Sequence, residues 1–153
     1  MLHQTENFPA VTLRFFLTYG PGQDTERFLP QTIHSCLIDS TFPTSTGEQF
    51  RDFCYVDDTV CAILQTLVVP EAVGNIINIA SGKPVTIREV LSLILKVSDY
   101  ENAPVEYDST KPTMIPKRMI DITLAKEKLG FQPKVSLEEG LQKTIKWYKN
   151  NIL

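Results

Sequence analysis

The chain has 153 residues, a formal net charge of −3 and 42% hydrophobic residues. These values are typical of one soluble domain with enough apolar side chains to form a core. An acidic chain attracts polyanions weakly, because nucleic-acid binding needs clustered basic side chains that release counterions. The longest apolar run is far shorter than the roughly 20 residues that span a bilayer, and the amino terminus lacks the pattern of a secretory leader. We therefore expect no nucleic-acid partner, no membrane insertion and a cytoplasmic location.

The cysteines and histidines give no sign of a metal site. Cys36, Cys54 and Cys61 lack the spacing of metal ligands and are interpreted as reduced packing residues. His3 and His34 have no partner at a metal-binding interval such as i+4. We predict no metal.

The first half of the chain predicts two strands and a helix. Residues 10–17 form an apolar run that ends at turn residues, which favours a buried strand, and residues 50–56 resemble a shorter one. A helix follows. We expect Asp57 or Asp58 to cap its first free amides and Pro70 to end it. Its apolar positions share one helical face: Val60, Ile63, Leu64 and Leu67.

The second half predicts a third strand at 75–79 and two capped helices. Thr86 to Glu89 and Ser136 to Glu139 each have the spacing of a capping box, in which the first and last side chains satisfy each other's backbone amides. The segments between these helices are predicted as an extended piece at 105–107, a surface loop at 108–117 and a short helix from 123 to 129 stopped by Gly130.

These elements predict an α/β fold with a small mixed sheet and about four helices, in a single lobe spanning residues 1–153. The strands at 10–17 and 75–79 are of a kind that normally lies within a larger sheet. Their exposed edges invite pairing with another chain. We therefore expect a homodimer, a partner that supplies the missing half, or poor solubility.

Three motifs follow one another along the chain. Residues 47–58 read Gly-Glu-Gln-Phe-Arg-Asp-Phe-Cys-Tyr-Val-Asp-Asp, and residues 13–23 read Leu-Arg-Phe-Phe-Leu-Thr-Tyr-Gly-Pro-Gly-Gln. The third is Lys111-Pro112, followed by a tail that ends in Leu-Gly-Phe-Gln-Pro at 129–133. Together they resemble the carboxy-terminal, substrate-binding half of the extended short-chain dehydrogenase/reductases, the NAD-dependent epimerase/dehydratase family that acts on nucleotide sugars.

The resemblance implies that this chain is the C-terminal part of a Rossmann-type fold, in which strands 10–17 and 75–79 belong to a larger sheet. A complete relative would use NAD or NADP for hydride transfer, with a tyrosine as acid/base and a lysine that lowers its pKa. The dinucleotide fingerprint and the Tyr-x-x-x-Lys pair belong upstream of Met1. We therefore expect the isolated chain to have no catalytic residue, no bound cofactor and no turnover.

Arg51 is the main candidate for substrate binding. A guanidinium fork suits a diphosphate, and the resemblance implies that this arginine contacts the substrate's phosphates. The alternative is a surface salt bridge to Asp52 or Asp57. Lys111, where the family often has arginine, and Arg118 are candidates for a second phosphate contact.

The remaining candidates come from two places in the chain. Arg27, Phe28, Phe42 and Thr44 align with the loops that enclose the nucleotide base, with core packing as the alternative for both phenylalanines.

Phe15, Phe16 and Leu17 would lie near the nicotinamide and the sugar, although a core position is favoured for at least one of the two phenylalanines. Many family members carry asparagine at the position of Leu17, and leucine cannot donate to a diphosphate oxygen.

Two other functions stay open. The chain could act as a truncated protein-interaction module, or as an independent non-enzymatic fold whose motif matches are only structural. Neither the base, the sugar, the choice between NAD and NADP nor the reaction outcome follows from the sequence.

Overall fold

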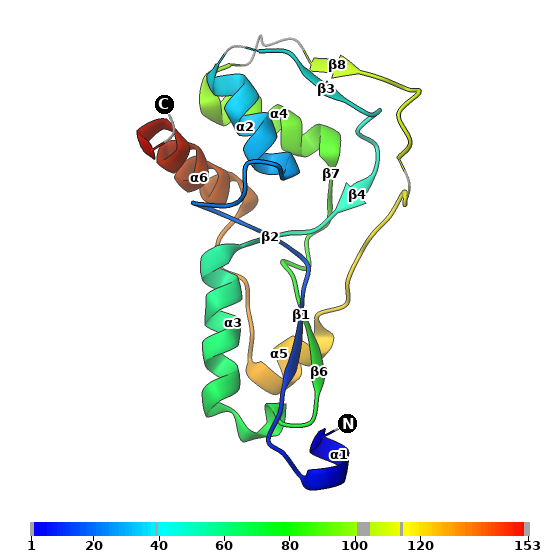
Figure 1. Ribbon diagram of the computed structural model, residues 1–153, viewed down its shortest axis with the longest axis vertical. Helices are drawn as coiled ribbons and strands as arrows, with labels where there is room; N and C mark the ends of the chain where they lie inside the picture. The colour runs from blue at the N-terminus through cyan, green and yellow to red at the C-terminus, as the bar shows by residue number, and fades with distance from the viewer. Residues whose placement is uncertain (1, 39, 101–104, 114, 152–153) are drawn as a thin grey trace.

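A computed structural model describes residues 2–38, 40–100, 105–113 and 115–151, and its strands and helices alternate as expected for an α/β fold (Figure 1). None of the helices in these ranges is long and apolar enough to cross a bilayer. The elements in chain order are α1 (Leu2–Glu6), β1 (Thr12–Phe15), β2 (Leu17–Tyr19), α2 (Phe28–Leu37), β3 (Phe42–Thr44), β4 (Phe50–Arg51), β5 (Phe53–Tyr55), α3 (Val56–Val68), a 3-10 turn (Pro70–Ala72), β6 (Ile76–Ile79), β7 (Val85–Thr86), α4 (Ile87–Ser98), β8 (Val105–Tyr107), α5 (Thr123–Leu129) and α6 (Leu137–Asn151).

The strands form four separate pairs. β1–β6, β2–β5 and β3–β8 are parallel, and β4–β7 is antiparallel. The predicted strand at 10–17 is divided at Phe16, whose amide makes a last bond to the Ile79 carbonyl (3.0 Å) before β2 turns to pair with β5. The predicted strand at 50–56 is divided in the same way at Asp52. Each run therefore changes partner midway.

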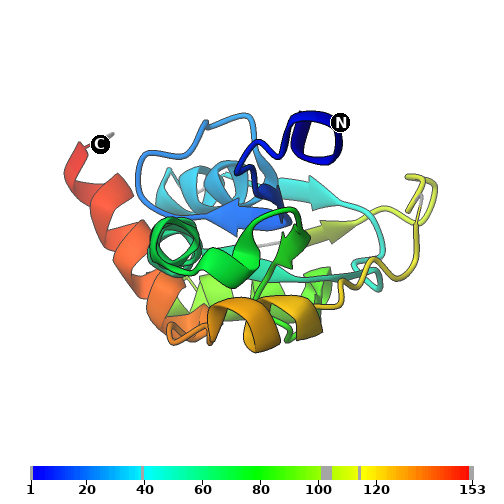
Figure 2. The ribbon, with the colours of Figure 1, turned by 90° about the horizontal axis from the view of Figure 1, so that it is seen from below.

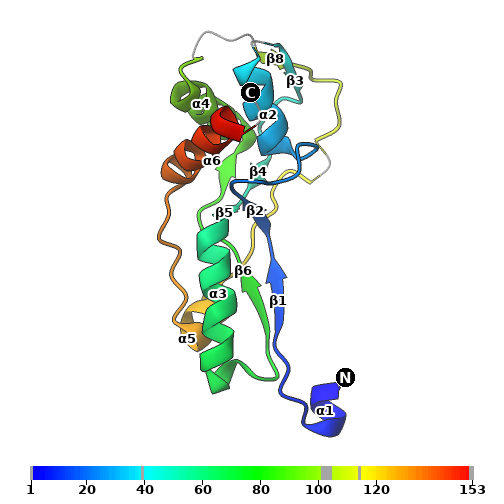
Figure 3. The ribbon, with the colours of Figure 1, turned by 60° about the vertical axis from the view of Figure 1, so that its left-hand side comes forward.

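The core has two parts. One lies among α2, α4, α6 and the β2–β5 pair and contains Leu91 and Tyr148, and the other lies beside β6 and α5 and contains Ile77 and Phe131. Figures 1 and 3 show the corresponding two ends of an elongated molecule, with α2, α4 and α6 at one end and α3, α5, β1 and β6 at the other. In the end-on view of Figure 2, α6 lies along one side and β3 and β8 lie on the opposite side.

The predicted capping box at α4 is confirmed. The Glu89 amide donates to Thr86 Oγ1 (3.1 Å), and the Glu89 carboxylate accepts from the Thr86 amide (2.7 Å) and hydroxyl (2.8 Å). These hydrogen bonds lower the pKa of Glu89. At α6, Ser136 accepts from the Glu139 amide (3.2 Å), and the Glu139 carboxylate pairs with Lys143 (2.8 Å).

Replacing Thr86 by alanine should lower the free energy of unfolding by about 1 kcal/mol at neutral pH, because α4 loses its cap. The depressed pKa of Glu89 means that its contribution is complete above the unfolded value of about 4.3 and is lost as the pH falls through the folded value. Urea unfolding followed by circular dichroism should therefore show the deficit narrowing in acid. Thr25→Ala, at an exposed turn, is the control, and an equal deficit in both variants would contradict the prediction.

α2 was not predicted, since residues 27–30 were interpreted as a loop around a ligand. Arg27 is instead the N-cap residue, and Pro30 lies in the first helical turn, where a missing amide costs little. Leu29, Ile33 and Cys36 recur at i, i+4 and i+7 and are buried. That spacing was the available signal.

The interpretation of Asp57 or Asp58 as a cap of α3 was wrong. The N-cap residue is Tyr55, and no side chain caps the helix. The buried Asp58 carboxylate accepts from the amides of Lys134 (3.0 Å) and Val135 (3.0 Å), so it ties α3 to the segment that precedes α6.

Candidate functional site

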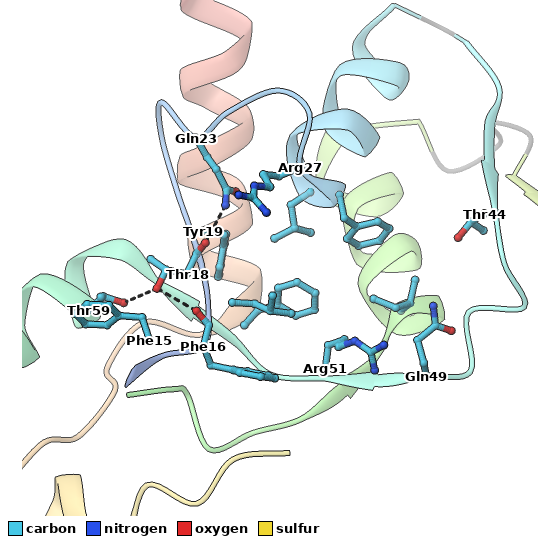
Figure 4. A pocket seen from close by; sticks show the side chains of 15 residues that line it. Phe15, Phe16, Thr18, Tyr19, Gln23, Arg27, Thr44, Gln49, Arg51 and Thr59 are labelled. Carbon is cyan, nitrogen blue, oxygen red and sulfur yellow. Dashed lines mark hydrogen bonds between the residues drawn. The ribbon is translucent and has the colours of Figure 1, made fainter. Parts of the chain in front are cut away.

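A cavity of about 730 Å³ opens between the β1–β2 segment, the start of α2 and the β4–β5 segment (Figure 4). Seven of the residues singled out from the sequence line it: Phe15, Phe16, Leu17, Arg27, Phe28, Thr44 and Arg51. Lys111 and Arg118 are not part of its lining. Phe42 opens β3, but its side chain lies outside the described parts of the structure.

The changes of strand partner bring these residues together. Phe16 stands where the chain passes from β1 to β2, and the loop after β2 leads to Arg27 and Phe28 at the start of α2. Arg51 ends β4, which pairs with β7. Phe50 of the same strand also forms an isolated parallel β-bridge with Lys117. Segments distant in sequence therefore share one wall.

The Arg51 guanidinium is held by main-chain carbonyls. Its Nη1 donates to the oxygens of Phe50 (2.7 Å) and Ile115 (2.9 Å). Because Nη1 carries two hydrogens, both are used, and within the described residues Nε and Nη2 remain available for an anionic ligand. The alternative interpretation was a salt bridge between Arg51 and Asp52. In the structure the Asp52 carboxylate instead accepts from the Ser81 amide (2.8 Å) and hydroxyl (2.6 Å).

Positive charge gathers around β4. The Arg118 amide donates to the Phe50 carbonyl (3.2 Å), and Lys117 Nζ lies 5.5 Å from the centre of the Phe50 ring. Partial burial, and then the nearby charge of Arg118, lower the pKa of Arg51. Guanidinium nevertheless stays protonated at neutral pH, so this end of the cavity attracts anions. Lys111 lies at a different place, where its Nζ donates to the Pro43 carbonyl beside β3 (3.3 Å).

Aromatic rings form another part of the lining. The rings of Phe28 and Phe53 have centres 6.4 Å apart, and the Tyr19 ring meets Phe53 edge-on at 6.3 Å. Burial raises the pKa of Tyr19 well above its ordinary value, and its hydroxyl donates to the Leu137 carbonyl (3.3 Å). Tyr19 is therefore a neutral wall residue and not an acid/base group.

Sequence reasoning missed four polar residues of the lining, namely Thr18, Gln23, Gln49 and Thr59. Gln23 Nε2 donates to the Thr18 carbonyl (2.9 Å), and Gln49 Nε2 donates to Ser45 Oγ (3.0 Å). Figure 4 shows Gln23 beside Arg27, and Gln49 beyond Arg51. Thr18, Gln23 and Gln49 stand within the two motifs that surround Tyr19 and Arg51, and Thr59 directly follows the second, which was the signal that could have found them.

A Tyr-x-x-x-Lys spacing does occur in this chain, at Tyr107 and Lys111. The two residues do not share a helix, because Tyr107 ends β8 and Asp108 begins a turn. The Tyr107 ring lies under the Arg88 guanidinium (4.1 Å), and neither Tyr107 nor Lys111 lines the cavity. Among the described residues, no three His, Cys, Asp or Glu side chains gather in a way that could hold a metal ion.

Comparison with known proteins relates most of the chain to one group of proteins. The sequence model of the family described as GDP-mannose 4,6 dehydratase matches residues 1–144. A UDP-N-acetyl-alpha-D-glucosaminuronate decarboxylase of Bacillus cytotoxicus is 34% identical over 94% of this chain and 47% of its own length. A probable GDP-L-fucose synthase 1 of Oryza sativa is 35% identical over 71% of this chain and 32% of its own length.

Solved structures agree closely with the fold. The epimerase Mth375 of Methanothermobacter thermautotrophicus has a TM-score of 0.90 and 27% identity, over 99% of this chain and 46% of that structure. The UDP-glucose 4-epimerase of Thermotoga maritima, solved with UDP-glucose, has a TM-score of 0.89 and 30% identity, over 99% of this chain and 49% of that structure. This chain therefore spans about half the length of these two structures. It spans 32% of the Oryza sativa relative and 47% of the Bacillus cytotoxicus relative.

Proposed function

Because this chain belongs to the GDP-mannose 4,6 dehydratase family, we propose that its cavity binds a nucleoside-diphosphate sugar as part of an NAD-dependent epimerase, dehydratase or reductase. The observation that carries the proposal is the Arg51 guanidinium on the cavity wall, held by two carbonyls through Nη1. A fork formed by Nε and Nη2 matches two oxygens of a diphosphate. Arg118 adds positive charge beside it.

We assign the base and the sugar to the aromatic parts of the wall. Phe28 offers a ring face for stacking, and Thr44 offers polar groups to the edge of a base; both line the cavity. Phe15, Phe16 and Leu17 form the wall that would face the sugar and the nicotinamide. Leu17 cannot donate a hydrogen bond, so Arg51 carries a larger share of phosphate binding here than in members with asparagine at that position.

NAD supplies reversible hydride transfer when it is bound in a complete protein, and a UDP-glucuronic acid 4-epimerase of Bacillus cereus was solved with UDP-glucuronic acid and NAD. The residues of this chain would contribute orientation, because Arg51 fixes the diphosphate while the apolar wall excludes water from the sugar. The residues that line the cavity in the described structure include no histidine, aspartate, glutamate, lysine or cysteine. We therefore propose that the isolated chain has no turnover, and chromatographic analysis of each nucleotide sugar after incubation with the chain and NAD or NADP would reveal any product.

The proposed binding is tested by calorimetric titration with UDP-, dTDP-, GDP- and CDP-sugars, and with NAD and NADP. We expect one nucleotide sugar to bind and Arg51→Ala to weaken it about 30- to 100-fold, the loss of a charged hydrogen-bonded pair. Arg51→Lys should recover only part of the affinity, since lysine keeps the charge and loses the fork.

The matched control is Arg88→Ala. Arg88 Nη2 also donates to a main-chain carbonyl, that of Thr46 (2.7 Å), but Arg88 does not line the cavity. An affinity that Arg51→Ala leaves unchanged would mean that the motif match is structural only. Absence of any binding would favour the alternative in which this chain is a protein-interaction module.

A further inference from the structure

The cavity lining holds a second cation, Arg27, which comes from a different part of the chain than Arg51. Arg27 directly precedes α2, whereas Arg51 ends β4. Among the described residues that line the cavity there is no aspartate or glutamate to pair with either guanidinium. Two positive charges therefore face one cavity without a counter-ion in its lining.

The main chain around Arg27 is held in place by hydrogen bonds. The Arg27 amide donates to the Asp24 carbonyl (3.1 Å), and its carbonyl accepts from the Gln31 amide (2.9 Å). The Tyr148 hydroxyl fixes the preceding loop by donating to the Gln23 carbonyl (2.6 Å). These contacts place the Arg27 side chain at the cavity without engaging its guanidinium.

The Arg27 guanidinium has no partner within the described part of the chain, neither a hydrogen-bond acceptor nor a carboxylate in an ion pair. The acidic residues beside it in sequence, Asp24 and Glu26, do not line the cavity, and Asp24 Oδ1 accepts from the Glu26 amide (3.0 Å). Arg27 is exposed, so water solvates its charge while the cavity is empty. A ligand that displaces this water has to supply an acceptor, because a desolvated cation without a partner is costly.

Figure 4 shows where Arg27 stands relative to the other polar residues of the cavity. Arg27 lies beside Gln23, whose Nε2 donates to the Thr18 carbonyl (2.9 Å). Thr44 lies on the other side of Arg51 from these residues. If Arg51 holds the diphosphate and Thr44 the base, as proposed above, Arg27 faces the sugar.

We infer that Arg27 binds a carboxylate on the sugar, so that the preferred ligand is a nucleoside-diphosphate hexuronic acid. The inference rests on the proposed binding of a nucleotide sugar. A hexuronic acid is ionised at neutral pH, and the two oxygens of its carboxylate match the guanidinium fork in a bidentate pair. A neutral hexose offers Arg27 only hydroxyl oxygens, which are weaker acceptors than a carboxylate.

Calorimetric titration of three matched ligands tests the inference. They are glucuronic acid, its neutral 6-amide and glucose, each carried on whichever of UDP, dTDP, GDP and CDP gives the tightest binding. We expect the acid to bind at least about tenfold tighter than the amide and the hexose. Arg27→Gln should weaken binding of the acid about 10- to 30-fold and change that of the hexose less than about twofold. Arg27→Lys should recover part of the preference, since lysine keeps the charge and loses the fork.

Controls separate the sugar contact from the diphosphate contact. Arg51→Ala should weaken the acid and the hexose by the same factor, because both carry the same diphosphate. Arg88→Ala should change neither, since Arg88 does not line the cavity. The far-ultraviolet circular dichroism of Arg27→Gln should match that of the unaltered chain, because the Arg27 side chain makes no hydrogen bond that caps α2.

The other outcomes overturn the inference, and they do so distinguishably. Equal weakening of the acid and the hexose by Arg27→Gln would mean that Arg27 shares the diphosphate with Arg51. A preference for the acid that survives Arg27→Gln would assign the carboxylate to another residue. Tighter binding of the hexose or the amide, still lost in Arg51→Ala, would remove the acidic sugar and leave the proposed function standing. If none of the nucleotide sugars binds, the proposed function fails and this inference fails with it.

Discussion

Replacing Asp52 by alanine is expected to lower the free energy of unfolding by about 3 kcal/mol, because it removes a buried acceptor and leaves donors unsatisfied. The Asp52 carboxylate is 1% exposed. One oxygen accepts from the Ser81 amide (2.8 Å) and hydroxyl (2.6 Å), and the other accepts from the Gly82 amide (2.8 Å). Hydrogen bonds to a charged acceptor are the strong ones, and three converge here.

Equilibrium unfolding in urea measures the change, with Glu48→Ala as an exposed control of the same charge. Ser81→Ala should cost only about 1 kcal/mol, since both backbone donors keep their acceptor. Asp52→Asn should fall between, because one amide oxygen replaces two carboxylate oxygens. An Asp52→Ala value that matches the Glu48→Ala value would show that the three bonds contribute nothing to stability.

The position of Asp52 also makes this variant informative about the site. Asp52 separates β4 from β5, so its bonds to the turn after β6 fix the point at which the strand leaves β7. Arg51 precedes Asp52 directly in the chain. We therefore expect Asp52→Ala to weaken any nucleotide-sugar binding as well, although Asp52 does not line the cavity.

Asp58→Ala is expected to lower the free energy of unfolding by about 2 kcal/mol, because the buried amides of Lys134 and Val135 lose their acceptor. The effect should be local as well as global. Hydrogen exchange at these two amides should accelerate more than exchange in α4, which Asp58 does not contact in the described hydrogen bonds.

Asp57→Ala is a close control, since it removes the same charge from the adjacent position of α3 and Asp57 is exposed. If the reading of Asp58 as a helix cap were correct, both variants would loosen the first turn of α3 similarly. A loss confined to Asp58→Ala, with faster exchange at Lys134 and Val135, would instead identify the long-range tie.

The sequence predicted what depends on local periodicity and capping. The α/β class, the strand at 75–79, α4 with its capping box, α5 with its stop at Gly130 and the extended piece at 105–107 are confirmed. Two motifs also indicated most of the cavity lining, because residues adjacent in a motif stay adjacent on one strand or turn. The roles of those residues toward a ligand remain predictions.

Tertiary structure alone decided the features that depend on distant partners. The strand breaks at Phe16 and Asp52 are set by which strands lie alongside, and the acceptor role of Asp58 joins it to amides 76 and 77 residues away. The sequence by itself determined that α3 has one apolar face, whereas the fold decided that this face points outward while Asp58 and Thr59 are buried. Periodicity specifies a face but not its neighbour, because the neighbour comes from residues remote in the chain.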